Sequence, residues 1–132
     1  MQITYRTDIS PTAEQIIELY NDAGLPRPTN DPGRMAEMYE HSDLVVSAWD
    51  GDKLVGVSRC ITDWVWCCYL ADLAIAGNYK GAGIGRKLVE VTKGRLGTKV
   101  MIVLLSVPTA LEYYPKIGFE KVDFGFIMKR TE

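Results

Sequence analysis

A strand that leads through a glycine-rich loop into a helix constrains the fold of this chain more than any other feature. Residues 66–75 are nearly all apolar and predict a strand that is buried on both faces. The glycine loop occupies residues 77–85, and apolar residues at helical spacing predict a helix over residues 84–96. A second apolar strand is predicted over residues 100–106. A strand, a helix and a strand in this order imply a right-handed parallel crossover.

The other predicted elements flank this crossover. Ser10 and Pro11 predict the start of a helix that Gly24 ends, and Asp31 with Pro32 predicts the start of a second helix. The remaining elements are strands over residues 2–8, 44–49, 54–61, 119–124 and 126–129, and a short helix over residues 109–117. The resulting order, β-α-α-β-β-β-α-β-α-β-β, predicts a mixed α/β (α+β) fold around a central sheet.

Length and composition exclude several classes of protein. The chain has 132 residues, which we interpret as a single domain over residues 1–132, and 47% of them are hydrophobic, which argues against disorder. A net charge of −2 provides no basic field for nucleic acid. The apolar stretches are shorter than a bilayer span, and residues 1–8 lack the apolar core of a signal peptide. We therefore expect a cytoplasmic protein without nucleic-acid or membrane partners.

The glycine loop has the chemistry of an anion site. Gly81, Gly83 and Gly85 allow a ligand to approach the backbone closely, and the helix N-terminus that follows adds partial positive charge. Lys80 and Arg86 supply cations beside it, so the site suits a diphosphate. Neither the dinucleotide fingerprint G-x-G-x-x-G nor the Walker A pattern matches. The structural alternative is a tight turn whose glycines serve packing alone.

Two segments together resemble one enzyme family. The loop is similar to motif A of the GNAT family of N-acetyltransferases, and it stands here as Lys80-Gly81-Ala82-Gly83-Ile84-Gly85. Tyr114, Gly118 and Phe119 then match the Tyr-x-x-x-Gly-Phe pattern of the family's last helix. The element order also matches, so the resemblance covers essentially the whole chain. Lys80 replaces the usual Gln or Arg, Val107 stands where Asn is frequent, and Pro115 stands where an acidic residue is frequent.

The resemblance implies how a co-substrate is held. Acetyl-CoA is expected between two parallel strands that splay apart, with its diphosphate on the loop and Tyr114 protonating the departing thiolate. The pantetheine arm is expected along the backbone of the first strand. The cofactor-binding residues implied are Leu73, Ala74, Ile75, Lys80, Gly81, Ala82, Gly83, Ile84, Gly85 and Arg86.

The implied activity is direct transfer of the acetyl group to a primary amine of a small molecule or peptide. A non-catalytic sensor that binds acyl-CoA is the alternative, and an edge-strand interaction module is a third hypothesis that leaves the glycine loop unexplained. No metal is expected, because the chain has one histidine and no C-x-x-C pattern. Edge strands near the C-terminus are compatible with a homodimer.

Other residues have two interpretations each. Asp72 is a candidate catalytic residue that relays a proton through water, or else a buried carboxylate that holds a neighbouring loop. Asp63 could contact an amine or serve a turn, and His41 could act as a base or end a surface helix. Cys67 and Cys68 are interpreted as packing residues rather than nucleophiles.

Overall fold

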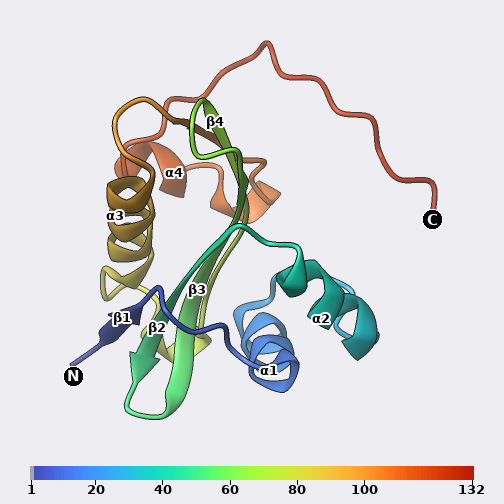
Figure 1. Ribbon diagram of the computed structural model, residues 1–132, viewed down its shortest axis with the longest axis vertical. Helices are drawn as coiled ribbons and strands as arrows, with labels where there is room; N and C mark the ends of the chain where they lie inside the picture. The colour runs from blue at the N-terminus through green and yellow to red at the C-terminus, as the bar shows by residue number, and fades with distance from the viewer. Residues whose placement is uncertain (1) are drawn as a thin grey trace.

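The computed structural model describes residues 2–132, and a five-stranded mixed sheet organises them (Figure 1). Neighbouring strands run antiparallel from the first to the fourth, and the fourth and fifth run parallel. The sheet confirms the predicted mixed α/β fold with its parallel crossover. In sheet order the strands are β1 (Thr4–Arg6), β2 (Leu44–Asp50), β3 (Lys53–Thr62), β4 (Cys67–Ile75) and β5 (Met101–Val103).

The helices cover the two faces of this sheet. The helices α1 and α2 lie on one side and α3 lies on the other, as Figure 1 shows. Leu88 and Thr92 of α3 are fully buried against the sheet, where the Thr92 hydroxyl lies 3.0 Å from that of Ser58. The helices are α1 (Ala13–Ala23), α2 (Pro32–Glu40), α3 (Ile84–Leu96) and the short α4 (Tyr113–Lys116), with 3-10 turns η1 (Gly77–Tyr79) and η2 (Pro108–Ala110). Across residues 2–132, no helix combines the length and apolar character that crossing a bilayer requires.

The parallel pair β4 and β5 separates along its length. The two strands pair only where Cys67, Cys68 and Tyr69 face Met101, Ile102 and Val103. The strand β4 then continues to Ile75 without β5 beside it. The predicted splay of two parallel strands is therefore confirmed, and it opens a space between them.

The first helix begins two residues later than the sequence predicted. Thr12, not Ser10, is the N-cap of α1, because its hydroxyl accepts the Gln15 N–H at 3.2 Å while the Gln15 side chain accepts the Thr12 N–H at 2.9 Å. This reciprocal capping box satisfies two backbone donors that a cap at Ser10 would leave open. Gly24 ends the helix in the left-handed conformation, with φ of 75°, as predicted.

The burial of β4 and the length of β5 differ from the prediction. In β4 the side chains of Cys68, Leu70 and Ala74 are buried, whereas Cys67 and Tyr69 are exposed. The strand is thus covered on one face where it pairs with β5, and burial on both faces was wrong. The strand β5 is also shorter than residues 100–106, because the chain leaves the sheet after Val103.

The two closing strands predicted over residues 119–124 and 126–129 are not formed. Among the described residues no strand follows β5, and residues 120–132 run outward from the body as an extended segment (Figure 1). A strand requires backbone partners, and this segment has none within the single chain. The apolar alternation that predicted the strands is real, but the single chain leaves it uncovered.

Candidate functional site

A pocket of about 560 Å³ fills the space where β4 and β5 separate. One wall is the unpaired half of β4, and the opposite wall is the chain that continues from β5 into α4. The glycine loop and the start of α3 close one end. The lining includes Ala71, Leu73, Ala74, Ile75, Lys80, Gly81, Gly83, Ile84, Gly85, Arg86, Leu104, Leu105, Val107, Tyr113 and Tyr114.

The glycines shape the end of the pocket at α3. Gly81 and Gly83 both have φ of 82°, a conformation that residues with a Cβ adopt at a cost in strain. Gly83 is the N-cap of α3, and no described side chain caps that helix. The first backbone N–H groups of a helix have no acceptor within it, so the N-terminus of α3 offers them, with its partial positive charge, to the pocket.

Two cations border this end while holding neighbouring elements. The Lys80 Nζ donates to the Ala23 carbonyl at 2.9 Å, which ties the loop to the end of α1. The Arg86 Nη2 donates to the Lys116 carbonyl at 2.6 Å, which ties α3 to the end of α4. Both residues line the pocket, so their charges favour an anion there. Ala82 alone among the predicted cofactor-binding residues does not line it.

The adjacent tyrosines of α4 occupy different places in the pocket. A Cβ built on Gly85 would run into the Tyr113 hydroxyl, so Tyr113 lies over the start of α3. The Tyr114 ring packs edge-on against Phe119, with 5.6 Å between centroids. Burial raises the pKa of both phenols; the charge of Arg86 opposes this at Tyr113, and that of Arg27 opposes it at Tyr114. Tyr114 lines the pocket, as Arg27 does, and is a protonated donor at neutral pH.

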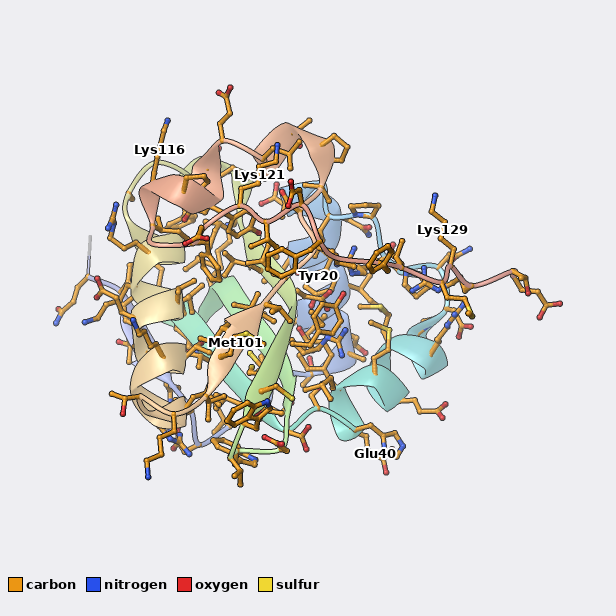
Figure 2. All side chains as sticks on the ribbon, turned by 90° about the horizontal axis from the view of Figure 1, so that it is seen from above. Tyr20, Glu40, Met101, Lys116, Lys121 and Lys129 are labelled. Carbon is orange, nitrogen blue, oxygen red and sulfur yellow. The ribbon has the colours of Figure 1, made fainter. Side chains whose placement is uncertain are left out.

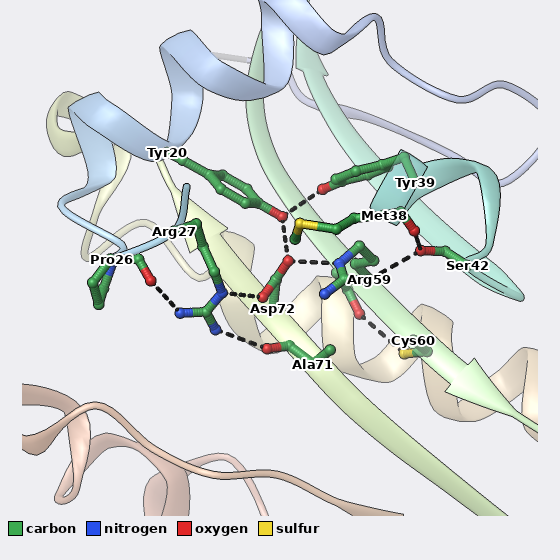
Figure 3. A network of polar contacts seen from close by, with 11 residues as sticks. Tyr20, Pro26, Arg27, Met38, Tyr39, Ser42, Arg59, Cys60, Ala71 and Asp72 are labelled. Atoms are coloured by element: carbon green, nitrogen blue, oxygen red, sulfur yellow. Dashed lines mark hydrogen bonds and ion pairs between the residues drawn. The ribbon is translucent and has the colours of Figure 1, made fainter. Parts of the chain in front are cut away.

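Asp72 lies behind the β4 wall in a buried ionic network (Figure 3). Its Oδ1 accepts Arg27 Nε at 2.6 Å, and its Oδ2 accepts Arg59 Nε at 2.6 Å and the Tyr20 hydroxyl at 2.7 Å. Tyr39 continues the network, 2.5 Å from the Tyr20 hydroxyl. The carboxylate is thus bound by two cations and a phenol, and its side chain has no exposed surface.

The electrostatics of Asp72 favour a structural contribution. Burial alone would raise its pKa, but the hydrogen bond and charge of Arg59, with the charge of Arg27, outweigh it and lower the pKa. The carboxylate is therefore ionised and a weak base. It does not line the pocket, whereas Arg27 does, and Arg27 Nη2 also donates to the Ala71 carbonyl at 2.9 Å. This geometry supports the second interpretation, a carboxylate that holds the loop after α1 against β4.

Sequence reasoning missed Arg27 as a residue of the pocket. Pro26 and Pro28 flank it, and Pro28 restricts the backbone of Arg27 to extended conformations. An arginine between two prolines in a loop that faces the predicted site was the available signal. Tyr113 is a second pocket residue that sequence reasoning missed, since nothing in the sequence shows that Gly85 faces it.

The remaining candidates serve local structure. Asp63 Oδ1 accepts the backbone N–H groups of Val65 at 2.9 Å and Trp66 at 2.8 Å, as a turn residue does. His41 is the C-cap of α2, as its alternative interpretation predicted. Cys68 is buried, and burial raises the pKa of its thiol, which disfavours a nucleophilic role.

Known proteins resemble this chain in sequence and in fold. The model of the acetyltransferase (GNAT) family matches residues 13–119, which include every residue that lines the pocket. An uncharacterized ycf52-like N-acetyltransferase of Prochlorococcus marinus is 29% identical over 92 residues, which cover 65% of this chain. The match covers 51% of that relative, so this chain spans about half the length of the curated protein.

Solved structures with the same fold include a Staphylococcus aureus protein and a GNAT acetyltransferase of Streptococcus pneumoniae. Each superposes with a TM-score of 0.78 at 23% identity. The superpositions cover 98% and 99% of this chain, respectively, and 100% of each neighbour. At this identity the likeness establishes the fold, and the family match over most of the chain establishes the relationship. This chain belongs to the GNAT family of acetyltransferases.

Proposed function

We propose that this chain transfers the acetyl group of acetyl-CoA directly to a primary amine of a small molecule or peptide. One observation carries the proposal: the pocket between the splayed strands has a glycine-lined helix N-terminus with two cations at one end. Its lining also includes Arg27 and a protonated tyrosine, Tyr114. A diphosphate fits the helix N-terminus with its cations. A thioester fits beside Tyr114, because the thiolate that leaves when it is cleaved needs a proton.

The length of β4 between these places supports an extended ligand. From Ala71, which binds Arg27, the strand continues four residues to Ile75, and that span covers about 13 Å. Within the described chain no strand pairs with this edge of β4. The backbone of Leu73, Ala74 and Ile75 can therefore hydrogen-bond an amide-containing arm such as pantetheine, as an added strand would.

The chemistry assigns one step to Tyr114. The neutral amine attacks the thioester carbonyl carbon, the C–N bond forms, and the C–S bond breaks as the oxyanion collapses. The Tyr114 hydroxyl donates its proton to the departing sulfur, so that CoA leaves as the thiol. The proton lost by the amine returns through water to restore the phenol. Asp72 takes part as a positioning residue, because it holds Arg27 beside this end of the pocket.

Thiol release in the presence of amines tests this function. Purified chain is mixed with acetyl-CoA and a panel of small amines and peptides, and free CoA is measured alongside acetyl-CoA binding by calorimetry. The proposal predicts binding together with amine-dependent thiol release. Binding without release for any amine would instead identify a non-catalytic acyl-CoA sensor, and an absence of binding would overturn both functions.

A further inference from the structure

The lining of the pocket carries positive charge at two separate places. The two cations at the glycine loop and Lys116 of α4 line the end where the diphosphate is proposed. Figure 2 shows Lys116 at the outer end of α4, apart from Tyr20 of the Asp72 network. The fourth cation of the lining, Arg27, belongs to that network. Because an acetyl thioester is uncharged, acetyl-CoA provides no anion for Arg27 at its reactive end.

Arg27 lies beyond the part of β4 that the pantetheine arm is proposed to follow. Its Nη2 donates to the Ala71 carbonyl at 2.9 Å. Ala71 precedes Leu73 by two residues, about 7 Å of strand, on the side away from the glycine loop. An arm that runs from the glycine loop along Ile75 to Leu73 therefore brings its thioester toward Arg27. The acceptor amine must reach the same place.

The Asp72 network has a net positive charge. Its single carboxylate is shared by Arg27 and Arg59, each at 2.6 Å, so two cations face one anion. Asp72 has no exposed surface, whereas 24% of the Arg27 side chain is exposed. Arg59 does not line the pocket, and Arg27 does. The charge that Asp72 does not balance is therefore accessible from the pocket at Arg27.

The Arg27 guanidinium also has hydrogen bonds left to donate. Three of its five N–H groups donate within the chain, to Asp72, to the Ala71 carbonyl and, at 2.7 Å, to the Pro26 carbonyl (Figure 3). One N–H on each Nη nitrogen has no acceptor among the described residues. Since arginine pairs best with carboxylates and phosphates, a carboxylate in the pocket suits these donors.

The pocket has no counter-charge for an acceptor that is only a cation. Among the described residues that line it there is no Asp, Glu or His. A polyamine, or the side-chain amine of a peptide, would arrive as an ammonium group and be repelled by Arg27. A zwitterion avoids this net repulsion, because its carboxylate can pair with the guanidinium.

We propose, on the basis of the acetyl transfer proposed above, that the acceptor is an amine that carries a carboxylate, as a free amino acid does. Arg27 binds the carboxylate while the amine faces the thioester. Asp72 holds Arg27 Nε at 2.6 Å and so fixes the guanidinium for this contact. Arg27 is then the residue that distinguishes a free amino acid from its carboxamide, which lacks the charge.

Matched pairs of acceptors measure this preference. The chain is assayed for thiol release from acetyl-CoA with free amino acids and with their carboxamides. Each kcat/KM is expressed per neutral amine, so that the different pKa values of the amines do not enter. The wild type should prefer the acid by roughly 10- to 150-fold, the range for a hydrogen bond to a charged group. Arg27→Gln should bring the ratio close to one, through a higher KM for the acid.

Arg59→Gln is the matched control. Arg59 holds the same carboxylate at the same distance as Arg27 does, but it does not line the pocket. Damage to the network alone should lower both rates and leave the ratio of acid to amide unchanged. Because both acceptors are measured on one preparation, partial unfolding of a variant cancels in that ratio.

The outcomes separate this acceptor class from the proposed function. Thiol release with amines, but with a wild-type ratio near one, overturns the acceptor class and leaves acetyl transfer standing, and this result needs no variant. A preference that Arg59→Gln removes as fully as Arg27→Gln also overturns it. An absence of thiol release with every amine overturns acetyl transfer itself, and the acceptor class with it.

The acyl group is the other possible source of a carboxylate at Arg27. Succinyl-CoA with a carboxamide acceptor tests this source, because the only carboxylate at the reactive end is then on the acyl chain. We expect a lower rate than with acetyl-CoA and the same carboxamide. A higher rate that Arg27→Gln abolishes would place the carboxylate on the acyl group and overturn its assignment to the acceptor.

Discussion

At Asp72, one carboxylate connects three parts of the chain that are far apart in sequence. Tyr20 comes from α1, Arg27 from the following loop and Arg59 from β3, and each donates to it. Removing the charge of one member leaves the others buried without compensation, which costs more than the ion pair contributes. We therefore expect any effect of Asp72 on activity to pass through the position of Arg27 and through stability.

Asp72→Asn should lower the free energy of unfolding at pH 7 by about 3 kcal/mol, because two partly buried arginines lose their counter-charge. The pKa of Asp72 is lowered in the folded state, so its stabilisation is present above its unfolded pKa of about 4 and is lost as the pH falls through the folded value. Urea unfolding should show the largest gap between the variant and wild type at neutral pH. That gap should shrink below about pH 4.

The control is Asp8→Asn, which removes the charge of an exposed ion pair and should change stability little. A gap that stays constant with pH would contradict this assignment.

Tyr114→Phe should reduce turnover by roughly 10- to 1000-fold, the range of general-acid contributions. The ring still packs on Phe119, so the fold and acetyl-CoA affinity should change little. Tyr113→Phe is the matched control, since its hydroxyl lies over Gly85 at the start of α3. We expect near-normal turnover for the control, and any effect should appear in the KM for acetyl-CoA. Loss of turnover in Tyr113→Phe with normal turnover in Tyr114→Phe would move the acid to the other ring.

Among the elements, α3 and its N-cap contain three glycines whose surroundings differ. Gly83 needs a positive φ, Gly85 needs room for the Tyr113 hydroxyl, and Gly94 has open space around it. The first two border the pocket, whereas Gly94 does not. Their alanine variants therefore separate binding at the glycine loop from the stability of the helix.

Gly83→Ala should weaken acetyl-CoA binding at least tenfold, about 1.4 kcal/mol, because a Cβ disfavours the left-handed turn that presents the helix N-terminus. Gly94→Ala should leave the affinity unchanged and raise stability by about 0.5–1 kcal/mol, through better helix propensity. Calorimetric titration and thermal unfolding of both variants provide the comparison. Equal affinities in folded Gly83→Ala and the wild type would exclude the glycine loop as the anion site.

The sequence predicted those elements whose signals are local. The bounds of α3 match because apolar spacing and the glycines mark its two ends. The strands predicted over residues 44–49 and 54–61 lie within β2 and β3, which Gly51 joins at a φ of 59°. The resemblance to the GNAT family also implied a site beside Leu73 and the glycine loop, and both line the pocket. It missed Arg27 and the absence of closing strands, because both depend on which distant segment lies opposite. Local alternation cannot show whether Phe126 is covered by its own chain or by another.

Across the whole molecule, the pocket divides a larger from a smaller part. The sheet from β1 to β4 with its helices holds most of the core, whereas β5 meets it through three residue pairs before the chain continues to α4. Arg86 adds one tie between α3 and α4. We therefore expect the smaller part, residues 101–118, to open at a lower free energy than the rest.

A ligand that contacts both walls should hold the smaller part in place. Residues of β4 and α3 line one side of the pocket, and Leu104, Val107 and Tyr114 line the other. Acetyl-CoA bound as we propose would therefore bridge the two parts. At a concentration of 100 times its dissociation constant, the ligand stabilises the closed state by about 2.7 kcal/mol. Amide exchange of residues 101–118 should then slow about 100-fold. Exchange in β3 should slow only by the amount that the ligand raises the stability of the whole protein.

The nucleotide part of CoA alone should reach the glycine loop but not Tyr114, so it should protect α3 more than residues 104–107. Equal protection of both segments by this fragment would show that α3 and α4 move together, and the Arg86 bond to Lys116 would be the contact responsible.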